Sequence, residues 1–385
     1  KDPNNALEMN ILELFHGPTL AFKDVAMQLI GNFYEYYLKK NNKKINIIVA
    51  TSGDTGAAAI EAIKGKKNMN IFVLHPHNKI STVQRKIMTT TKEKNVFNIA
   101  IERGHFDDCQ NLVKSMFSDQ DFSNSINMSG VNSINWARII AQSVYYFYAY
   151  FQSEFVRGNL YKEPINFSVP TGNFGDVYAG YLAKKMGLPI NKLIVATNDN
   201  DILHRAISNG NYEVKKVFQT LSPSMDIQVA SNFERLIYDI NDFSDIETEK
   251  VMNEIKKTGK YKIPKDKITK IKKDFLSASL SVEEMKKIMI KLSMHYTGVM
   301  VDPHTAIGLG AIIKTVNENK DSGVNPFNTI SLATAHPAKF PEAMRFAYGG
   351  VELPEELKYV MKEKENFDIL DNNINVVKNY ILRKI

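Results

Sequence analysis

The chain has 385 residues, of which 44% are hydrophobic and 24% are charged. This composition is typical of a soluble globular protein with room for two hydrophobic cores, and it excludes a fibre, a disordered tail and a small disulfide-stapled module. The single cysteine, Cys109, cannot form an internal disulfide or a thiolate metal cluster, so nothing requires an oxidising compartment and we expect a cytoplasmic protein.

The formal net charge is +7, but the lysines are dispersed along the chain and are not gathered with aromatic residues on one stripe. We therefore expect no nucleic-acid partner, although the basic excess suits anionic small molecules. The longest apolar stretch, residues 139–151, falls short of the roughly 20 residues that span a bilayer, so we expect no membrane partner either.

Short β-branched runs alternate along the chain with longer stretches of helical periodicity. Strands are predicted at residues 45–51, 70–74, 97–101, 165–169, 192–197 and 329–334. Helices are predicted at residues 57–64 and 177–186, each closed by a glycine, and Ser281 with Glu284 resembles a capping box that opens a helix toward His295. This alternation predicts an α/β fold in which open parallel sheets carry helices on both faces.

The same pattern predicts two α/β domains. Residues 1–44 and 153–348 are expected to form the larger domain, and residues 45–152 the smaller one. The lysine-rich segment 247–274 is poor in large apolar side chains, which favours a surface insertion without a catalytic role. The charged end of the chain, residues 349–385, is expected to add one or two helices on the outside.

Two strand-to-helix turns place small, flexible residues where a helix begins. The first, residues 51–56, has the sequence TSGDTG, and the second, residues 170–176, has the sequence PTGNFGD. Glycines free the backbone to direct several N–H groups at one point, and the helix N-terminus adds a positive field. Each turn is therefore a candidate anion site, although one such turn alone is more often a tight connection. Neither turn matches the Walker or the dinucleotide-binding pattern, which disfavours a nucleotide site.

A third feature surrounds Lys23, which follows an apolar stretch and precedes a predicted helix that runs toward Tyr37. Desolvation by Leu20 and Phe22 and the positive end of that helix would both disfavour the ammonium form of Lys23. Lys23 is therefore a candidate nucleophilic amine. The alternative is a surface lysine that extends its stem over apolar residues and pairs with Asp24.

Eight sequence strings, in order over nearly the whole chain, resemble the threonine synthase family, and more narrowly its longer fungal-type members. The strings are ELFHGPTLAFKD (13–24), ATSGDTGAA (50–58), NSINWAR (132–138), VPTGNFGD (169–176), ATNDNDIL (196–203), LSPSMDI (221–227), DPHTAIG (302–308) and ATAHPAKF (333–340). The family depends on pyridoxal 5'-phosphate and has fold type II, like the tryptophan synthase β subunit, so the resemblance implies this fold and this cofactor. Family members begin with a further N-terminal segment that is absent from this sequence, so we expect the chain to be a fragment.

The resemblance implies roles for cofactor-binding residues. Lys23 lies where the family carries the lysine that forms the Schiff base with the cofactor. The second turn falls where the family binds the cofactor phosphate, and its residues are Gly172, Asn173, Phe174, Gly175 and Asp176. Asp176 is expected to cap the helix, because its charge would repel a phosphate. Thr334 matches the neutral residue that faces the pyridine nitrogen, although a threonine at a strand end is by itself more often structural.

Two further groups of residues are assigned to the substrate by the resemblance. The first turn matches the loop that holds the substrate α-carboxylate, through Ser52, Gly53, Asp54 and Thr55. Asp54 is expected to point away and cap the helix, while Ser52 and Thr55 donate hydrogen bonds. The substrate phosphate is assigned to residues at the opening of the predicted helix 139–150: Asn132, Ser133, Asn135 and Arg138. Without the resemblance, Arg138 would be an ordinary solvated helix arginine.

The reaction implied by the resemblance is the conversion of O-phospho-L-homoserine and water into L-threonine and phosphate, by γ-elimination and β-addition. One alternative is a pyridoxal-phosphate-dependent hydroxyamino-acid dehydratase, which would need no pocket for a substrate phosphate. Another is an inactive homologue or phosphate-binding protein, against which the presence of Lys23 argues. His304 and His336 are expected to be structural, no metal site is predicted, and we expect a monomer or a homodimer.

Overall fold

The structure, a computed structural model, describes residues 9–153, 157–158, 163–295 and 299–385. The chain divides into two compact units. The first comprises residues 1–14, 138–337 and 342–350, and the second comprises residues 15–137, 338–341 and 351–385. These bounds differ from the expected ones, because residues 15–44 and the end of the chain cluster with the second unit and residues 138–152 with the first.

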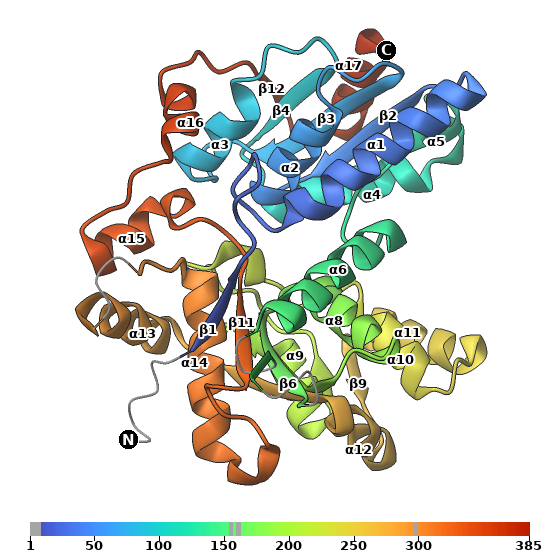
Figure 1. The fold of residues 1–385 in the computed structure, drawn as a ribbon. Helices are drawn as coiled ribbons and strands as arrows, with labels where there is room; N and C mark the ends of the chain where they lie inside the picture. Colours follow the sequence, from blue (N-terminus) through green and yellow to red (C-terminus); the bar gives the residue numbers. More distant parts are fainter. Residues whose placement is uncertain (1–8, 154–156, 159–162, 296–298) are drawn as a thin grey trace. The chain divides into compact units, whose positions relative to one another are not determined.

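A five-stranded parallel sheet lies at the centre of the first unit (Figure 1), with the strand order β1-β11-β6-β7-β10. Its strands are β1 (Asn10–Glu13), β6 (Ile165–Pro170), β7 (Ile190–Thr197), β10 (Phe275–Ser279) and β11 (Thr329–Ala333). The strands β6, β7 and β11 confirm three predicted strands. Every residue of β6 and β11 is buried, although apolar and polar residues alternate along both strands. Buried polar side chains such as Ser168, whose hydroxyl donates to the Gly308 carbonyl (2.7 Å), are hydrogen-bonded.

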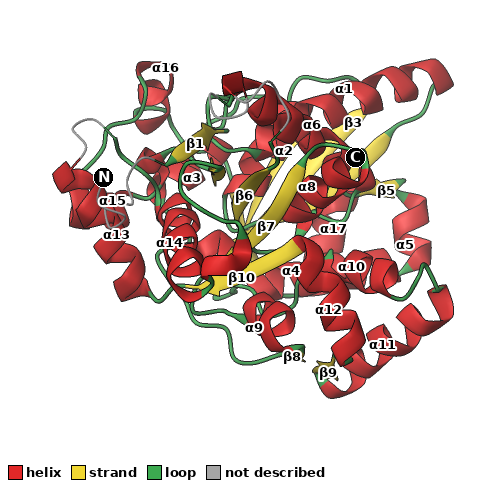
Figure 2. Ribbon diagram, turned by 60° about the horizontal axis from the view of Figure 1, so that its bottom comes forward, coloured by secondary structure: helices red, strands yellow, loops and turns green. Residues whose placement is uncertain are grey.

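Helices cover both faces of this sheet (Figure 2). The helices of this unit are α6 (Trp136–Gln152), α8 (Gly175–Lys185), α9 (Ile202–Asn209), α10 (Phe233–Ile240), α11 (Asp245–Thr258), α12 (Lys265–Asp274), α13 (Val282–His295), α14 (Pro303–Glu318) and α15 (Pro341–Tyr348). Of these, α8, α9, α12 and α14 pack directly against the strands. The predicted capping box of α13 is confirmed, since Ser281 N–H donates to Glu284 Oε2 (2.7 Å) and Glu284 N–H donates to Ser281 Oγ (3.2 Å).

The lysine-rich segment 247–274 is more than a surface insertion. It forms parts of α11 and α12 and the short strand β9 (Lys260–Lys262), which pairs antiparallel with β8 (Asn211–Glu213). Val251, Ile255 and Ile271 are buried in the core of the first unit. The few apolar residues of the segment are therefore spaced to face the core, while its lysines line the outer faces of the two helices.

The second unit has its own five-stranded parallel sheet, with the order β12-β4-β3-β2-β5. Its strands are β2 (Ile45–Ala50), β3 (Met69–Pro76), β4 (Val96–Glu102), β5 (Met128–Ser129) and β12 (Asp368–Asp371). The strands β2, β3 and β4 confirm the other three predicted strands. Neighbouring residues of β2 face opposite cores, because Ile47 packs with the helices on one face and Ile48 with those on the other.

The helices of the second unit are α1 (Lys23–Asn41), α2 (Asp54–Ile63), α3 (Thr82–Thr89), α4 (Phe106–Ser118), α5 (Gln120–Ser125), α16 (Glu355–Lys358) and α17 (Ile374–Lys384). Short 3₁₀ helices occur at Pro223–Met225 (η1), Lys320–Ser322 (η2), Pro337–Lys339 (η3) and Tyr359–Met361 (η4). No helix in the described part of the chain is long and apolar enough to cross a bilayer.

The end of the chain is an integral part of the second unit, and the expectation of outer helices alone is wrong. Strand β12 extends the sheet by pairing with β4, and α17 buries Val377 and Ile381 in the core. The side chain of Arg85 on α3 donates two hydrogen bonds to the carboxylate of Glu365 (2.8 and 3.1 Å), which anchors the segment ahead of β12.

Candidate active site

Lys23 was predicted to precede a helix and is in fact the first residue of α1, with its side chain only 12% exposed. Its Nζ lies 4.8 Å from the centre of the Phe22 ring and 3.6 Å from Asp54 Oδ2. The expected desolvation is therefore present. The carboxylate of Asp54 acts in the opposite direction, because an anion at this distance favours the charged amine.

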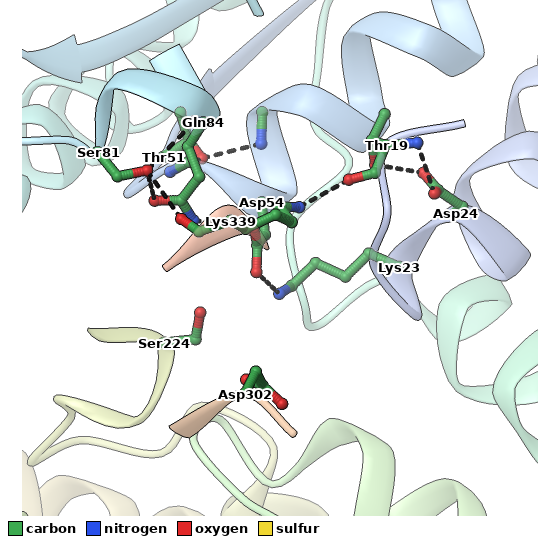
Figure 3. Close-up of polar contacts among 12 residues, drawn as sticks. Thr19, Lys23, Asp24, Thr51, Asp54, Ser81, Gln84, Ser224, Asp302 and Lys339 are labelled. Atoms are coloured by element: carbon green, nitrogen blue, oxygen red, sulfur yellow. Dashed lines mark hydrogen bonds and ion pairs between the residues drawn. The ribbon is translucent and has the colours of Figure 1, made fainter. Parts of the chain in front are cut away.

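The alternative interpretation of Lys23 as a surface lysine paired with Asp24 is wrong. The carboxylate of Asp24 instead accepts hydrogen bonds from the backbone N–H (2.9 Å) and the hydroxyl (2.5 Å) of Thr19. Burial raises the pKa of Asp24 despite these hydrogen bonds and the charge of Lys339. Asp24 thus closes the turn ahead of α1 and leaves Lys23 directed toward α2 (Figure 3).

Asp54 does not cap α2, contrary to the prediction. It is the first residue of the helix, and the cap position is Gly53, whose φ of +135° is costly for any residue with a β-carbon. The hydroxyl of Thr51 instead accepts hydrogen bonds from the N–H groups of Gly53 (2.9 Å) and Gly56 (2.8 Å). Because Thr51 occupies these two amides, Asp54 is left to bind other groups.

Those groups are side chains from distant parts of the chain. Asp54 Oδ1 accepts a hydrogen bond from Gln84 Nε2 (2.9 Å) and lies 2.7 Å from Lys339 Nζ, while its Oδ2 faces Lys23. Burial alone would raise the pKa of the Asp54 carboxyl. The charges of Lys339 and Lys23, with the hydrogen bonds from Lys339 and Gln84, outweigh burial and hold that pKa well below its ordinary value.

Sequence reasoning missed Lys339. The residue is completely buried in the second unit, and its Nζ also donates to the carbonyl oxygen of Thr19 (2.7 Å). One signal was available, since Lys339 stands in the apolar string ATAHPAKF directly after the last buried strand. A lysine in such a position is buried only at a high cost unless an anion pairs with it.

The second turn lies in the first unit, between β6 and α8. Phe174 precedes α8 in the left-handed conformation (φ +64°), which costs about 1–2 kcal/mol for a residue with a β-carbon. Its ring is buried against Phe233 and Phe275, so core packing holds the backbone in this state. The first helical bond runs from Tyr178 N–H to Phe174 C=O (3.1 Å), so the amides of residues 175–177 lie ahead of the helix ladder, where an anion can be bound.

Neighbouring segments hold this turn closely. A β-carbon on Gly172 would lie 2.5 Å from the carbonyl oxygen of Ser224, and the carbonyl of Asn173 accepts hydrogen bonds from both the N–H and the Nδ2 of Asn232 (3.1 Å each). The turn is therefore preorganised, and glycine is needed at position 172 for this close approach.

Asp176 does not cap α8, so this prediction is also wrong. Its Oδ1 accepts hydrogen bonds from the hydroxyls of Tyr145 (2.5 Å) and Tyr146 (2.8 Å) on α6. Burial and the Asp176 carboxylate raise the pKa of both hydroxyls well above the ordinary value, so both remain protonated donors. Asp176 therefore fixes α8 to α6.

Thr334 is buried and directly follows β11, which pairs in parallel with β6. The register places Ser331 beside Ser168, so the residues after β11 and the turn after β6 lie at the same edge of the sheet. The first unit thus brings a neutral hydroxyl and a candidate phosphate turn to adjacent strand ends.

Of the residues assigned to the substrate phosphate, three precede α6 and one, Arg138, lies in its first turn. Asn135 accepts a hydrogen bond from Ala137 N–H (3.0 Å) and donates to the hydroxyl of Tyr34 (3.4 Å), which lies about three turns along α1 from Lys23. Asn132 accepts a hydrogen bond at its carbonyl from Asn135 N–H (3.2 Å), and Ser133 is half-buried beside it.

Arg138 lies in the first unit with its side chain only 3% exposed, so it is not an ordinary solvated helix arginine. Burial lowers the pKa of its guanidinium to about 10, which still leaves the group cationic at neutral pH.

His304 is buried and contacts two neighbouring segments of the first unit. Its Nδ1 lies 2.6 Å from Asp302 Oδ2, and its Nε2 accepts a hydrogen bond from Ser224 N–H (3.3 Å). Asp302 also caps α14 through the N–H groups of His304 and Thr305 (3.1 Å each). The pair therefore supports the segment that contacts Gly172. His336 is half-buried just after β11.

Two family models match the chain: one described as pyridoxal-phosphate dependent enzyme, over residues 12–263, and one described as threonine synthase, C-terminal, over residues 305–381. Threonine synthase of Saccharomyces cerevisiae is 43% identical over 97% of this chain and 77% of its own length, and that of Pseudomonas aeruginosa is 45% identical over 96% and 77%. The chain belongs to the threonine synthase family. A crystal structure of pyridoxal-phosphate-bound threonine synthase from Brucella melitensis matches with a TM-score of 0.88 at 45% identity, covering 97% of this chain and 78% of that one.

Three groups of residues, each taken by itself, fit the cofactor of this family. A phosphate dianion suits the amides at the start of α8, where the left-handed Phe174 and the clamped Gly172 hold the backbone open. The neutral hydroxyl of Thr334 at the adjacent strand end suits an unprotonated pyridine nitrogen. In the second unit, Lys23 is a buried primary amine of the kind that forms a Schiff base.

Proposed function

We propose that this chain converts O-phospho-L-homoserine and water into L-threonine and phosphate. The observation that carries the proposal is the buried amine of Lys23 at the start of α1, in a chain of the threonine synthase family. An amine withdrawn from solvent and fixed by a rigid helix is available for covalent chemistry in a way that a surface lysine is not.

The cofactor is assigned to the residues that match the cofactor-binding motifs of the family. Lys23 would bind its aldehyde carbon, the turn of Gly172, Asn173, Phe174, Gly175 and Asp176 would hold its phosphate through backbone amides, and Thr334 would face its ring nitrogen. Asp176 contributes its N–H group only, because its carboxylate is engaged by the two tyrosine hydroxyls. When bound, pyridoxal phosphate supplies an electron sink for charge that develops on the substrate carbons.

Lys23 would then move the protons of the reaction. Once the substrate amine had displaced it, the Lys23 amine would accept the proton from Cα, and it would have to give that proton up before accepting one from Cβ, with phosphate leaving from Cγ. A proton is returned to Cγ, water adds its oxygen at Cβ, and Cα is protonated again. The sum is one water consumed and one phosphate released for each threonine.

The substrate α-carboxylate is assigned to the first turn, through the hydroxyls of Ser52 and Thr55 and the backbone around Gly53. Both hydroxyl-bearing side chains are half-buried at the start of α2. Asp54 belongs to the same loop, but its carboxylate does not bind the substrate, because its two oxygens face Lys339, Gln84 and Lys23. Its neutralisation by lysine makes a carboxylate substrate tolerable beside it.

The substrate phosphate is assigned to Arg138, with Asn132, Ser133 and Asn135 ahead of it. Arg138 is the strongest of these candidates, since its guanidinium is both buried and cationic. A desolvated guanidinium binds a phosphate dianion more strongly than an exposed one. Asn135 already serves as the cap of α6, which leaves it a smaller part in binding.

The test measures phosphate release from O-phospho-L-homoserine by the protein with pyridoxal phosphate. The change Lys23→Ala should lower the rate by about three orders of magnitude or more, because the covalent step and the proton transfers are both removed. The matched control is Lys39→Ala, at the exposed end of the same helix, which should leave the rate unchanged.

Three results would count against the proposal. Full phosphate release by Lys23→Ala would remove Lys23 from the mechanism. Release of ammonia from L-serine or L-threonine, without release of phosphate from phosphohomoserine, would indicate a dehydratase. Borohydride reduction that fixes no pyridoxal phosphate on Lys23 would indicate an inactive homologue or a phosphate-binding protein.

We also propose a cytoplasmic monomer or homodimer with this small molecule as its partner. The free, buried thiol of Cys109 supports a reducing compartment. Fractionation of cells that express the full-length protein, followed by light scattering of the purified protein, tests both points.

A further inference from the structure

Lys339 has the most unusual environment among the charged groups of the second unit. Its side chain is 0% exposed, and its Nζ lies 2.7 Å from both the Thr19 carbonyl oxygen and Asp54 Oδ1. Burying an ammonium group is costly, and a well-packed apolar residue of similar volume would often serve stability better. The groups around Lys339 therefore suggest a function for its charge.

The carboxylate of Asp54 stands between two lysines (Figure 3). Its Oδ1 lies 2.7 Å from Lys339 Nζ, and its Oδ2 lies 3.6 Å from Lys23 Nζ. The three groups come from η3, α2 and α1, so three separate segments of the second unit bring them together. The shorter of the two distances belongs to Lys339, which makes it the principal counter-ion of Asp54.

A hydrogen-bonded frame holds Lys339 at both ends. At the backbone, Ser81 Oγ donates to the Lys339 carbonyl (3.1 Å), and Ser81 also caps α3. At the side chain, the Thr19 carbonyl fixes Nζ, and Gln84 Nε2 holds Asp54 Oδ1 (2.9 Å). The ammonium of Lys339 therefore has a fixed position relative to the reactive lysine.

We propose that Lys339 is a positioning residue, which keeps the Lys23 amine reactive by taking up the charge of Asp54. The inference rests on the proposed function, in which Lys23 is the reacting amine. Without Lys339, the carboxylate of Asp54 would have Lys23 as its only cationic partner in this group, and it would hold Lys23 as a protonated, unreactive ammonium. With Lys339 present, most of that attraction is cancelled, and a second positive charge nearby opposes protonation of Lys23.

The other charged group of this cluster is Asp24, which shares helix α1 with Lys23. It is engaged by Thr19 and feels the charge of Lys339. Asp54 on α2 and Asp24 on α1 are therefore two anionic groups close to these lysines. The cation of Lys339 offsets their negative charge, which favours the unprotonated, reactive form of the Lys23 amine.

The experiment follows Schiff-base formation on the full chain with excess pyridoxal phosphate. At each pH, borohydride reduction fixes the cofactor, and peptide mass spectrometry measures the fraction of chains labelled on Lys23. The change Lys339→Met should raise the midpoint of this pH profile by about one unit, so that below the midpoint about tenfold fewer chains are labelled. The change Lys339→Arg keeps the charge and should restore much of the profile.

A second comparison avoids leaving a buried carboxylate without its counter-ion. The midpoint of the double variant Asp54→Asn with Lys339→Met should be higher than that of Asp54→Asn alone, because only the latter retains the cation beside Lys23. Folding of each variant is checked by near-ultraviolet circular dichroism. This pair decides the question even where Lys339→Met alone does not fold.

Equal midpoints for Asp54→Asn and the double variant would overturn the proposal, and would leave Lys339 a purely structural residue. The same holds if folded Lys339→Met shows the wild-type midpoint. Failure of the proposed function looks different, because the wild-type chain would then carry no label on Lys23 at any pH. A lower yield of label with an unchanged midpoint also counts against the proposal.

Discussion

The two strand-to-helix turns, one in each unit, have similar sequences but use their acidic residues differently. Both follow a buried parallel strand, and both have an aspartate in the first turn of the next helix. Asp176 binds two neutral tyrosine hydroxyls, whereas Asp54 binds two lysines. A buried aspartate paired with hydroxyls joins two helices, while one paired with cations sets the charge around a reactive amine.

The backbone amides of the two turns differ in the same way. In the first turn, the hydroxyl of Thr51 accepts hydrogen bonds from two of the amides. In the second, the hydroxyl of Thr171 donates instead to the carbonyl of Val169 (2.6 Å). Similar sequences therefore yield one turn built around its own threonine and another that presents its helix terminus.

The largest loss in the free energy of unfolding is expected when the ion pair between Asp54 and Lys339 is broken. Asp54→Ala leaves the fully buried ammonium of Lys339 without its counter-ion, and it should lower the free energy of unfolding by about 3–5 kcal/mol. Urea unfolding followed by circular dichroism measures this. The double variant with Lys339→Met should recover a large part of the loss, and failure to recover any would show that the two charges are not coupled.

The pH dependence of stability also tests whether Asp54 acts through its charge. The folded-state pKa of Asp54 lies well below the ordinary value of about 4, so its stabilising contribution is fully present above that pH and is lost as the pH falls below it. Asp54→Asn should therefore be less stable than the wild type at pH 7, with a gap that narrows in acid. Urea unfolding at pH 7 and pH 3 tests this, and a gap of constant size would contradict it.

A smaller loss in the free energy of unfolding is expected when Asp176 is removed from its two tyrosine hydroxyls. Asp176→Ala removes the acceptor of Tyr145 and Tyr146, and leaving these buried donors unpaired should cost about 1–3 kcal/mol. No charge is left uncompensated on the tyrosines, so the loss should be clearly below that for Asp54→Ala. Urea unfolding of the two variants side by side provides the measurement, and equal losses would remove the distinction between the turns.

The sequence predicted the elements that are buried and regular. All six predicted strands are present, because each is a short segment with β-branched or aromatic residues that is bounded by a helix or a turn. The strands β1 and β12 were missed because each is an edge strand of four residues, with polar residues at its ends. Strand β10 was missed because its sequence, FLSAS, follows the lysine-rich helix α12 without a turn signal.

The site was predictable to the extent that its chemistry is local. Lys23 stood out because its neighbours along the chain are apolar and a helix follows. Lys339 was missed because its role depends on Thr19, which is 320 positions away, and on a carboxylate at the start of another helix. The caps assigned to Asp54 and Asp176 failed for the same reason, since long-range partners took both side chains from their local positions.

The smallest losses in the free energy of unfolding are expected from changes to Thr51 and Thr171. Thr51→Val keeps the volume but leaves the amides of Gly53 and Gly56 without their acceptor, and it should cost about 2 kcal/mol. Thr171→Val is the matched control, because it removes one donor from a carbonyl that has a second lone pair, and it should cost about 1 kcal/mol. Urea unfolding distinguishes the two, and the reverse order would mean that the amides of the first turn find another acceptor when Thr51 is gone.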